Sequence, residues 1–213
     1  MLVKRVLVGM LFAVGFSVAQ ASDWKLETTD EALGINVFTR DVVGSEFKEY
    51  KGVTELSSTL SGVVALMKDS DNLPNWIHNM VEQKVLKRKA GKSLTYSVSN
   101  ARGTEPRDNI VMSNYSQDLE TNIITISMKG KPKHLPEKEG YIRVPLVKGS
   151  WIFAPKGNGK IEIVYQLHVE PGGNLPPKMY NEVGAIDAPL GTLSGMHKQI
   201  AKYQDQKLDF VSE

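Results

Sequence analysis

Apolar and polar residues alternate through most of residues 85–169, and glycine, proline or asparagine interrupts the alternation at intervals. A period of two predicts β-strands with one face on a core and the other in solvent. The expected strands are residues 26–40, 47–56, 85–89, 93–100, 109–117, 122–129, 141–147, 150–154 and 160–169. Short turns such as Asn158-Gly159 favour hairpins, so the simplest arrangement of the strands from residue 85 on is one long antiparallel meander.

Helical spacing interrupts this pattern after the opening strands and again near the C-terminus. Ser58 is expected to cap a first helix, and Asp71 a second short helix that carries Trp76 and Met80. A C-terminal helix is expected over about residues 189–203, with its apolar side chains on one face. These elements predict an α+β grip, in which a curved antiparallel sheet wraps around a long C-terminal helix and two short helices follow the first strands.

The concave face of such a sheet either packs directly on the helix or encloses a cavity, and the alternation alone leaves both open. Asn114 and Tyr165 fall in phase with apolar neighbours, which is typical of a ligand cavity with few polar groups. The candidate cavity residues are Tyr96, Met112, Asn114, Ile124, Ile126, Met128, Ile163, Tyr165, Leu167, Leu193, Met196 and Ile200.

The N-terminus has the composition of a secretory signal peptide. Lys4 and Arg5 precede an uncharged apolar stretch at 6–18, and Ala19-Gln20-Ala21 is typical of a cleavage site. The apolar stretch is short of the ~20 residues that span a bilayer. We therefore expect cleavage after Ala21 and a periplasmic mature chain. Removing residues 1–21 takes away two basic residues and leaves 24 basic against 24 acidic.

The composition excludes several classes of function. Without cysteine the chain has no disulfide, thiolate zinc site or cysteine nucleophile. No two of its four histidines have the spacing of a metal motif, and we expect surface or lid positions for His78, His134, His168 and His197. We find no nucleophile elbow and no phosphate-binding loop, so no catalytic residue, metal or cofactor is expected.

Four short motifs are distinctive in their order and spacing. They are Pro106-Arg107-Asp108 at a strand start, Lys148-Gly149-Ser150-Trp151 with Pro155 after it, the stretch VEPGGNLP at 169–176, and Leu73-Pro74-Asn75-Trp76 ahead of Val85-Leu86. Over about residues 25–208 the chain resembles the START domain, the steroidogenic-acute-regulatory-protein-related lipid transfer domain. The resemblance implies a helix-grip fold, and the expected order of strands and helices agrees with it.

The resemblance implies that residues 22–213 form a domain that binds, and transfers, one lipid-like molecule beneath the C-terminal helix. Transient membrane contact and a monomer are expected, and the zero net charge gives no support for nucleic-acid binding. Two alternatives remain open. An enzyme such as a cyclase or hydrolase on the same scaffold would place a titratable pair in the cavity, and a protein-interaction module would fill the grip with side chains.

The chain also departs from the family. Related sterol carriers place an acidic and a basic side chain in the cavity, whereas Ser113 and Asn114 stand here where the basic one falls, so we expect a neutral polar floor. Arg107 is expected to tie loops together, and Asp108 to accept hydrogen bonds from backbone donors. Gly191 and Gly195 either weaken the C-terminal helix into a lid or let it pack closely. The lysine-rich stretch at 129–138 is either a solvated loop or a contact for anionic head groups.

Overall fold

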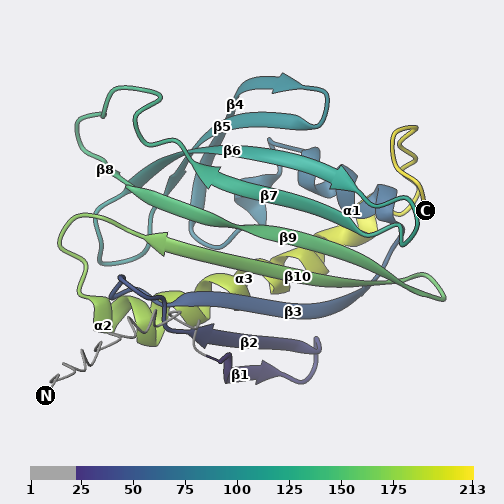
Figure 1. The fold of residues 1–213 in the computed structure, drawn as a ribbon, viewed down its shortest axis with the longest axis horizontal. Helices are drawn as coiled ribbons and strands as arrows, with labels where there is room; N and C mark the ends of the chain where they lie inside the picture. Colours follow the sequence, from purple (N-terminus) through teal and green to yellow (C-terminus); the bar gives the residue numbers. More distant parts are fainter. Residues whose placement is uncertain (1–22) are drawn as a thin grey trace, which may run out of the picture.

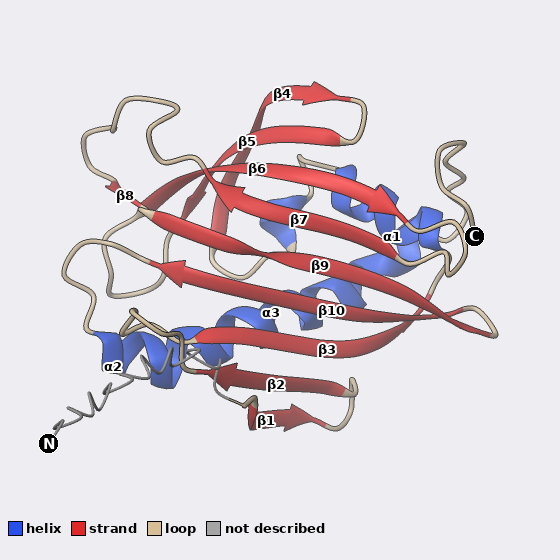
Figure 2. Cartoon of the chain, viewed as in Figure 1, coloured by secondary structure: helices blue, strands red, loops and turns tan. Residues whose placement is uncertain are grey.

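A computed structural model of the protein describes residues 23–213, and the expected signal peptide at 1–21 lies outside them. Ten strands form one curved sheet, and the helices lie against one of its faces (Figures 1 and 2). The strands are β1 (Lys25–Asp30), β2 (Ile35–Arg40), β3 (Glu49–Ser57), β4 (Met80–Lys89), β5 (Lys92–Ser99), β6 (Arg107–Gln117), β7 (Ile124–Gly130), β8 (Ile142–Arg143), β9 (Leu146–Gly157) and β10 (Lys160–Glu170). The predicted α+β helix-grip fold is confirmed.

The order of strands in the sheet is β1-β2-β3-β10-β9-β7-β6-β5-β4. The antiparallel meander predicted from residue 85 on is confirmed, because β4, β5, β6, β7, β9 and β10 pair in this order. After β3 the chain crosses to the opposite edge through α1 (Leu60–Lys68) and η1 (Leu73–Asn75), and only the last strand, β10, returns to pair with β3. β8 pairs with β6 in parallel, away from the main path. Hairpin signals predict neighbouring pairs along the chain, but they carry no information about the long connection that closes the sheet.

Several element boundaries differ from the prediction. The expected strand at 26–40 is two strands, because Gly34 has a φ of +63° and the Asp30 carboxylate accepts a hydrogen bond from the Leu33 amide in the turn between them. The expected strands at 141–147 and 150–154 are instead the two-residue β8 and the continuous β9. The Asn158-Gly159 hairpin is confirmed, with φ values of +52° and +69°.

The two short helices also differ in detail. Thr59, and not Ser58, caps α1 by accepting a hydrogen bond from the Gly62 amide. The second helix is only the 3-10 turn η1, and its cap residue, Asn72, makes no side-chain capping bond. Met80 begins β4, because Asn79 takes a left-handed φ of +57° and ends the turn before it.

The C-terminal helical segment is longer than predicted and begins twelve residues earlier. It runs through α2 (Pro177–Met179), the π-helical turn η2 (Tyr180–Gly184), α3 (Ala185–Gln199) and the 3-10 turn η3 (Ile200–Tyr203). Pro177 starts the segment, where its missing amide hydrogen costs nothing, while Pro189 lies inside α3. Among residues 23–213 no helix is both long and apolar enough to cross a membrane.

Glycines set how closely α3 approaches its neighbours. A Cβ atom on Gly195 would collide with the backbone of Trp76, and one on Gly191 with the ring of His78. On the sheet, a Cβ atom on Gly52 would lie 2.6 Å from the Leu193 side chain. Of the two interpretations of Gly191 and Gly195, these contacts favour close packing.

The buried side chains form a main core and a smaller one. The main core lies between the helices and the covered face of the sheet, and includes Leu60, Phe153, Ile163, Leu193 and Met196. The smaller core consists of Leu94, Tyr96, Val98 and Ile110, with Met112, Leu135 and Tyr141 packed against it. Leu135 and Tyr141 belong to the connection between β7 and β8, so this connection packs on side chains of β5 and β6.

Candidate functional site: an internal cavity

A cavity of about 1280 Å³ lies between the sheet and the helices. This volume exceeds the roughly 300–1,000 Å³ of most small-molecule sites. Its walls come from α1, η1, strands β3 to β7, β9 and β10, and the first part of the C-terminal helical segment. A filled grip, as expected of an interaction module, would leave no such space.

Two parts of the cavity lining differ in polarity. One part is largely apolar and is formed by Val64, Met67, Leu73, Ile77, Ile126, Met128, Trp151 and Leu167. Another part of the lining is a neutral polar floor on β5 and β6, formed by Ser93, Thr95, Ser97, Asn109 and Ser113. On this floor the Ser97 hydroxyl donates to the Asn109 side-chain oxygen at 2.9 Å. An amphipathic ligand could therefore place its apolar part against these apolar residues and its polar groups at the floor.

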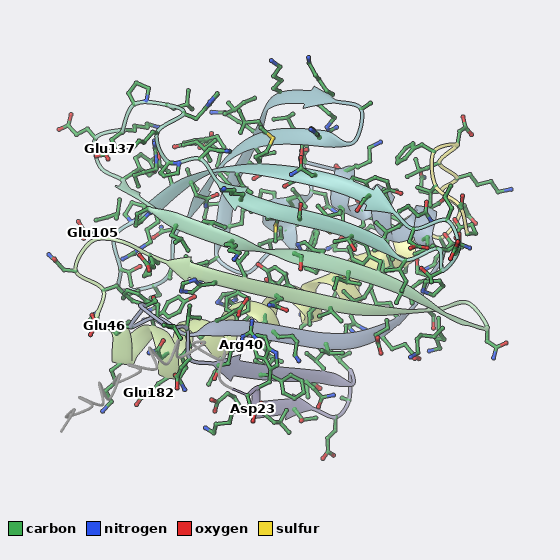
Figure 3. The ribbon with its side chains drawn as sticks, viewed as in Figure 1. Asp23, Arg40, Glu46, Glu105, Glu137 and Glu182 are labelled. Atoms are coloured by element: carbon green, nitrogen blue, oxygen red, sulfur yellow. The ribbon has the colours of Figure 1, made fainter. Side chains whose placement is uncertain are left out.

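The cavity reaches the surface where exposed residues line it. These are Arg88, Lys89 and Lys92 near the tip of the β4–β5 hairpin, Phe210 in the C-terminal stretch, and Met179 and Val183 at the start of the helical segment. The acidic residues labelled in Figure 3, among them Glu105, Glu137 and Glu182, lie at the periphery, and Asp187 is the only acidic residue in the lining. The part of the rim formed by the β4–β5 hairpin is therefore basic.

Three tyrosines and a tryptophan form an aromatic cluster at the helical end of the cavity. Tyr50 and Tyr165 face each other from β3 and β10, with their hydroxyl oxygens 3.0 Å apart. Trp151 stacks on Tyr165 with 3.9 Å between ring centroids, and Tyr180 joins the lining from η2. Burial raises the pKa of all three tyrosines, so their hydroxyls stay neutral.

Residues 19–206, most of the chain and the whole sheet and helical segment, match the START domain family. The chain belongs to this family. An uncharacterized protein of Pseudomonas aeruginosa is 34% identical to this START domain protein over 197 residues, which are 92% of this chain and 96% of that one.

Two solved structures agree with this assignment. A fragment of a STAR-related lipid transfer protein from Xanthomonas axonopodis is 27% identical, with a TM-score of 0.77 over 84% of this chain and 98% of the other. Human StAR-related lipid transfer protein 5 shares the fold, with a TM-score of 0.75, 16% identity and coverage of 85% and 88%.

The START domain places the predicted cavity residues in three groups. Ile126, Met128, Tyr165 and Leu167 line the cavity. Ile124, Ile163, Leu193, Met196 and Ile200 pack in the main core outside the lining. Tyr96 and Met112 belong to or pack against the smaller core, and Asn114 lies outside the lining as well. Contact of any of them with a ligand stays a prediction.

On β5 and β6 the predicted cavity residues lie on one face of each strand, and most of the residues that line the cavity lie on the other. We expected the larger apolar residues of these strands to face the cavity, but the cavity is lined by the alternate residues, such as Thr95 and Val111. The β7–β8 connection covers the apolar set on the other side, which is why that set is buried. Alternation identifies the two faces of a strand, but it cannot tell which face lies toward the ligand when both are covered.

Arg107 and Asp108 have structural partners. Arg107 donates hydrogen bonds to the carbonyl oxygens of Pro171 and Glu105 at 3.2 and 2.8 Å, as the loop-tying role predicts. It also lines the cavity, so it adds one cation beside the neutral floor. Asp108 accepts two hydrogen bonds from the Arg143 guanidinium at 2.7 and 3.0 Å, and not from backbone donors as predicted. Its partner is 35 residues away, and local sequence carries no signal for it.

The histidines are less exposed than predicted. His134 is exposed, but His168 is buried, with Nε2 3.2 Å from the Ser45 hydroxyl, and His197 Nε2 lies 2.8 Å from the Thr54 hydroxyl. His78 lines the cavity, and burial lowers its pKa against the opposing effect of Asp187. In residues 23–213 no group of three or more His, Asp or Glu side chains is placed to hold a metal ion.

A neutral polar floor was predicted at Ser113 and Asn114, and Ser113 lines the cavity, but Tyr50, Tyr180 and the part of the floor on β5 were not predicted. Ser93, Thr95 and Ser97 alternate with Leu94 and Tyr96, so their shared face was visible in the sequence but was assigned to solvent. Tyr180 lay outside the predicted helix, and Tyr50 carries no local signal that distinguishes it from a core tyrosine.

Proposed function

We propose that the protein binds one lipid-like molecule in this cavity and carries it through an aqueous compartment. The observation that supports the proposal most is the cavity itself, which has a largely apolar part and another part with neutral polar groups. A lipid gains about 0.8 kcal/mol for each methylene removed from water, whereas its polar end needs only a few hydrogen-bonding partners. A domain that encloses such a space without an assembled catalytic group is suited to carriage.

The compartment we propose is the periplasm. The basic start, the apolar stretch and Ala19-Gln20-Ala21 support export with cleavage after Ala21. The mass of the exported protein tests this: a chain that begins at Ser22 agrees, and retention of residues 1–21 contradicts it.

Exchange with a membrane is the second part of the proposal. The β4–β5 hairpin carries Lys84, Lys87, Arg88, Lys89 and Lys92 against the single acidic Glu82. Val85 and Leu86 are exposed on it at 38% and 40%, and its tip borders the cavity. Basic and apolar side chains together suit contact with an anionic bilayer, and this position would bring the opening of the cavity to the membrane.

Catalysis is the competing function, because His78 and Asp187 both line the cavity. No hydrogen bond joins them in the described part of the chain, and Asp187 is exposed, so they do not form an assembled acid–base pair. We therefore propose binding without turnover.

Lipid extraction from protein purified out of its own periplasm, combined with native mass spectrometry, tests the proposal. We expect a one-to-one complex with a lipid that is recovered chemically unchanged. Protein that carries no lipid and takes up none would contradict carriage, and a ligand converted by the wild type but not by a His78→Ala variant would favour the enzyme.

A further inference from the structure

The tyrosine cluster at the helical end of the cavity contains a hydroxyl that has no partner in the described part of the chain. Tyr180 is 8% exposed, lines the cavity, and its hydroxyl makes no hydrogen bond to residues 23–213. Its ring is held by an edge contact with Phe47, with the centroids 5.4 Å apart. Buried hydroxyls are nearly always paired, so an unpaired one in a cavity wall indicates a group that the ligand supplies.

The Tyr50–Tyr165 pair also has one hydroxyl hydrogen that its mutual hydrogen bond does not use. Each phenolic hydroxyl has one hydrogen to donate. The 3.0 Å contact between Tyr50 and Tyr165 uses one of their two hydrogens, whichever of them is the donor. The second hydrogen, and that of Tyr180, have no acceptor among the described residues. The cluster therefore offers two free O–H donors to the cavity.

These donors are uncharged, and so is their immediate surrounding. Burial is the main cause of the raised pKa of Tyr50, Tyr165 and Tyr180, and the other groups that act on them are tyrosines of the same cluster. A phosphate or carboxylate would enter such a site without a counter-ion, at a high desolvation cost. A neutral oxygen that accepts two hydrogen bonds meets no such cost.

We propose that Tyr50, Tyr165 and Tyr180 form the polar subsite of the cavity and donate hydrogen bonds to the carbonyl, ester or hydroxyl oxygen of a neutral lipid. This inference rests on the proposed lipid-binding function and names the class of ligand. The subsite is rigid before the ligand arrives, because Trp151 stacks on Tyr165 at an interplanar angle of 10° and Tyr180 is fixed in η2. Rigid donors hold their geometry without further loss of entropy on binding.

The test uses four probes with the same cis-9 eighteen-carbon chain and different ends: methyl oleate, oleyl alcohol, oleate and cis-9-octadecene. Each displaces Nile red from the wild type, from Tyr180→Phe, from Tyr165→Phe and from Tyr96→Phe. Tyr96 is the control, because its hydroxyl is also buried but faces Asp108 outside the cavity lining.

We expect the wild type to prefer methyl oleate and oleyl alcohol over oleate and octadecene. Tyr180→Phe removes one of the two free donors, so it should weaken binding of the two neutral oxygenated probes by about three- to tenfold and leave octadecene unchanged. Tyr165→Phe should have a smaller effect, because it frees the Tyr50 hydroxyl and keeps two donors. Tyr96→Phe should bind as the wild type does. The thermal midpoint of ligand-free Tyr180→Phe should be unchanged or higher, because an unpaired buried hydroxyl has been removed.

Three outcomes would overturn the inference. Equal weakening for octadecene would show that the tyrosines only shape the cavity, and a preference for oleate would assign the subsite to anions. Binding of all four probes without regard to their ends would reject the subsite while leaving lipid binding intact. If the wild type takes up neither Nile red nor any probe, the proposed function itself fails and the subsite with it.

Discussion

Burial of His197 links the stability of the domain to pH. Burial, and to a lesser extent Lys160, lowers the pKa of His197 below its ordinary value of 6.5, with Asp30 opposing. The unfolded chain then binds this proton at a higher pH than the folded chain, so stability falls as the pH drops below about 6.5 and levels off below the lowered pKa. We expect the urea midpoint to decline over this interval.

His197→Gln should flatten the decline. Part of it should remain, because burial also lowers the pKa of His78. His134→Gln, at an exposed position, is the control and should keep the full decline. An identical pH profile for the His197 variant and the wild type would contradict this account.

The Asp108–Arg143 pair lies at the centre of a buried network. The side chains are 1% and 5% exposed, and Arg143 also donates to the carbonyl oxygens of Pro132, Leu135 and Pro136. Arg143→Met leaves the carboxylate buried without its partner, so we expect a loss of about 3–5 kcal/mol in the free energy of unfolding.

Urea denaturation measures this loss, and the double variant Asp108→Asn with Arg143→Met should lose less than the sum of the single variants. A loss below about 1 kcal/mol for Arg143→Met, as for an exposed pair, would contradict the buried role.

At the scale of elements, Gly195→Ala separates the two interpretations of the C-terminal helix. A flexible lid would gain up to about 1 kcal/mol of helix propensity from alanine. Against the backbone of Trp76, however, the new methyl group has no room, and we expect a net loss of about 1–3 kcal/mol or more in a thermal or urea melt. Lys198→Ala, at an exposed position of the same helix, should be nearly neutral, and a stabilised Gly195→Ala would support the lid.

The basic hairpin makes a separate prediction. Lys87 and Lys89 are exposed near its tip, and each basic residue near an anionic surface contributes about 1 kcal/mol. Replacing both by Gln should weaken sedimentation with phosphatidylglycerol vesicles by about 10- to 30-fold at low salt. Lys131→Gln with Lys133→Gln is the matched control in the β7–β8 connection, which Arg143 holds against the sheet. Loss of binding in the control, with none in the hairpin variant, would assign membrane contact to residues 129–138 instead.

The elements show what local sequence could and could not predict. Alternation at 93–100 and 109–117 identified β5 and β6 within two residues, and Asn158-Gly159 identified the β9–β10 turn. The phase of β5 and β6 toward the cavity was not predictable, because it depends on the β7–β8 connection that buries Tyr96 and Met112 from the other side. The early part of the C-terminal segment was missed because Pro189 was taken as a helix start, whereas the chain carries the proline inside α3.

At the scale of the whole molecule, the class of fold followed from sequence and the cavity did not. Ile126 and Ile124 have the same side-chain type and the same phase on β7, yet Ile126 lines the cavity and Ile124 is packed with no exposed surface. The difference lies in the tertiary packing around each residue, which alternation along one strand does not describe.

The central claim is that this space is kept open for a ligand, and Ile126→Trp tests it most directly. In a cavity the indole enters free volume, so the urea midpoint of the ligand-free protein should change little while lipid binding is lost or strongly weakened. In a filled core the same overpacking would cost about 1–3 kcal/mol or more. Thr125→Trp, one residue away and outside the lining, controls for the new side chain and should keep both stability and binding. A large drop in stability for Ile126→Trp, with none for Thr125→Trp, would show that the grip is filled and would contradict the lipid carrier proposed here.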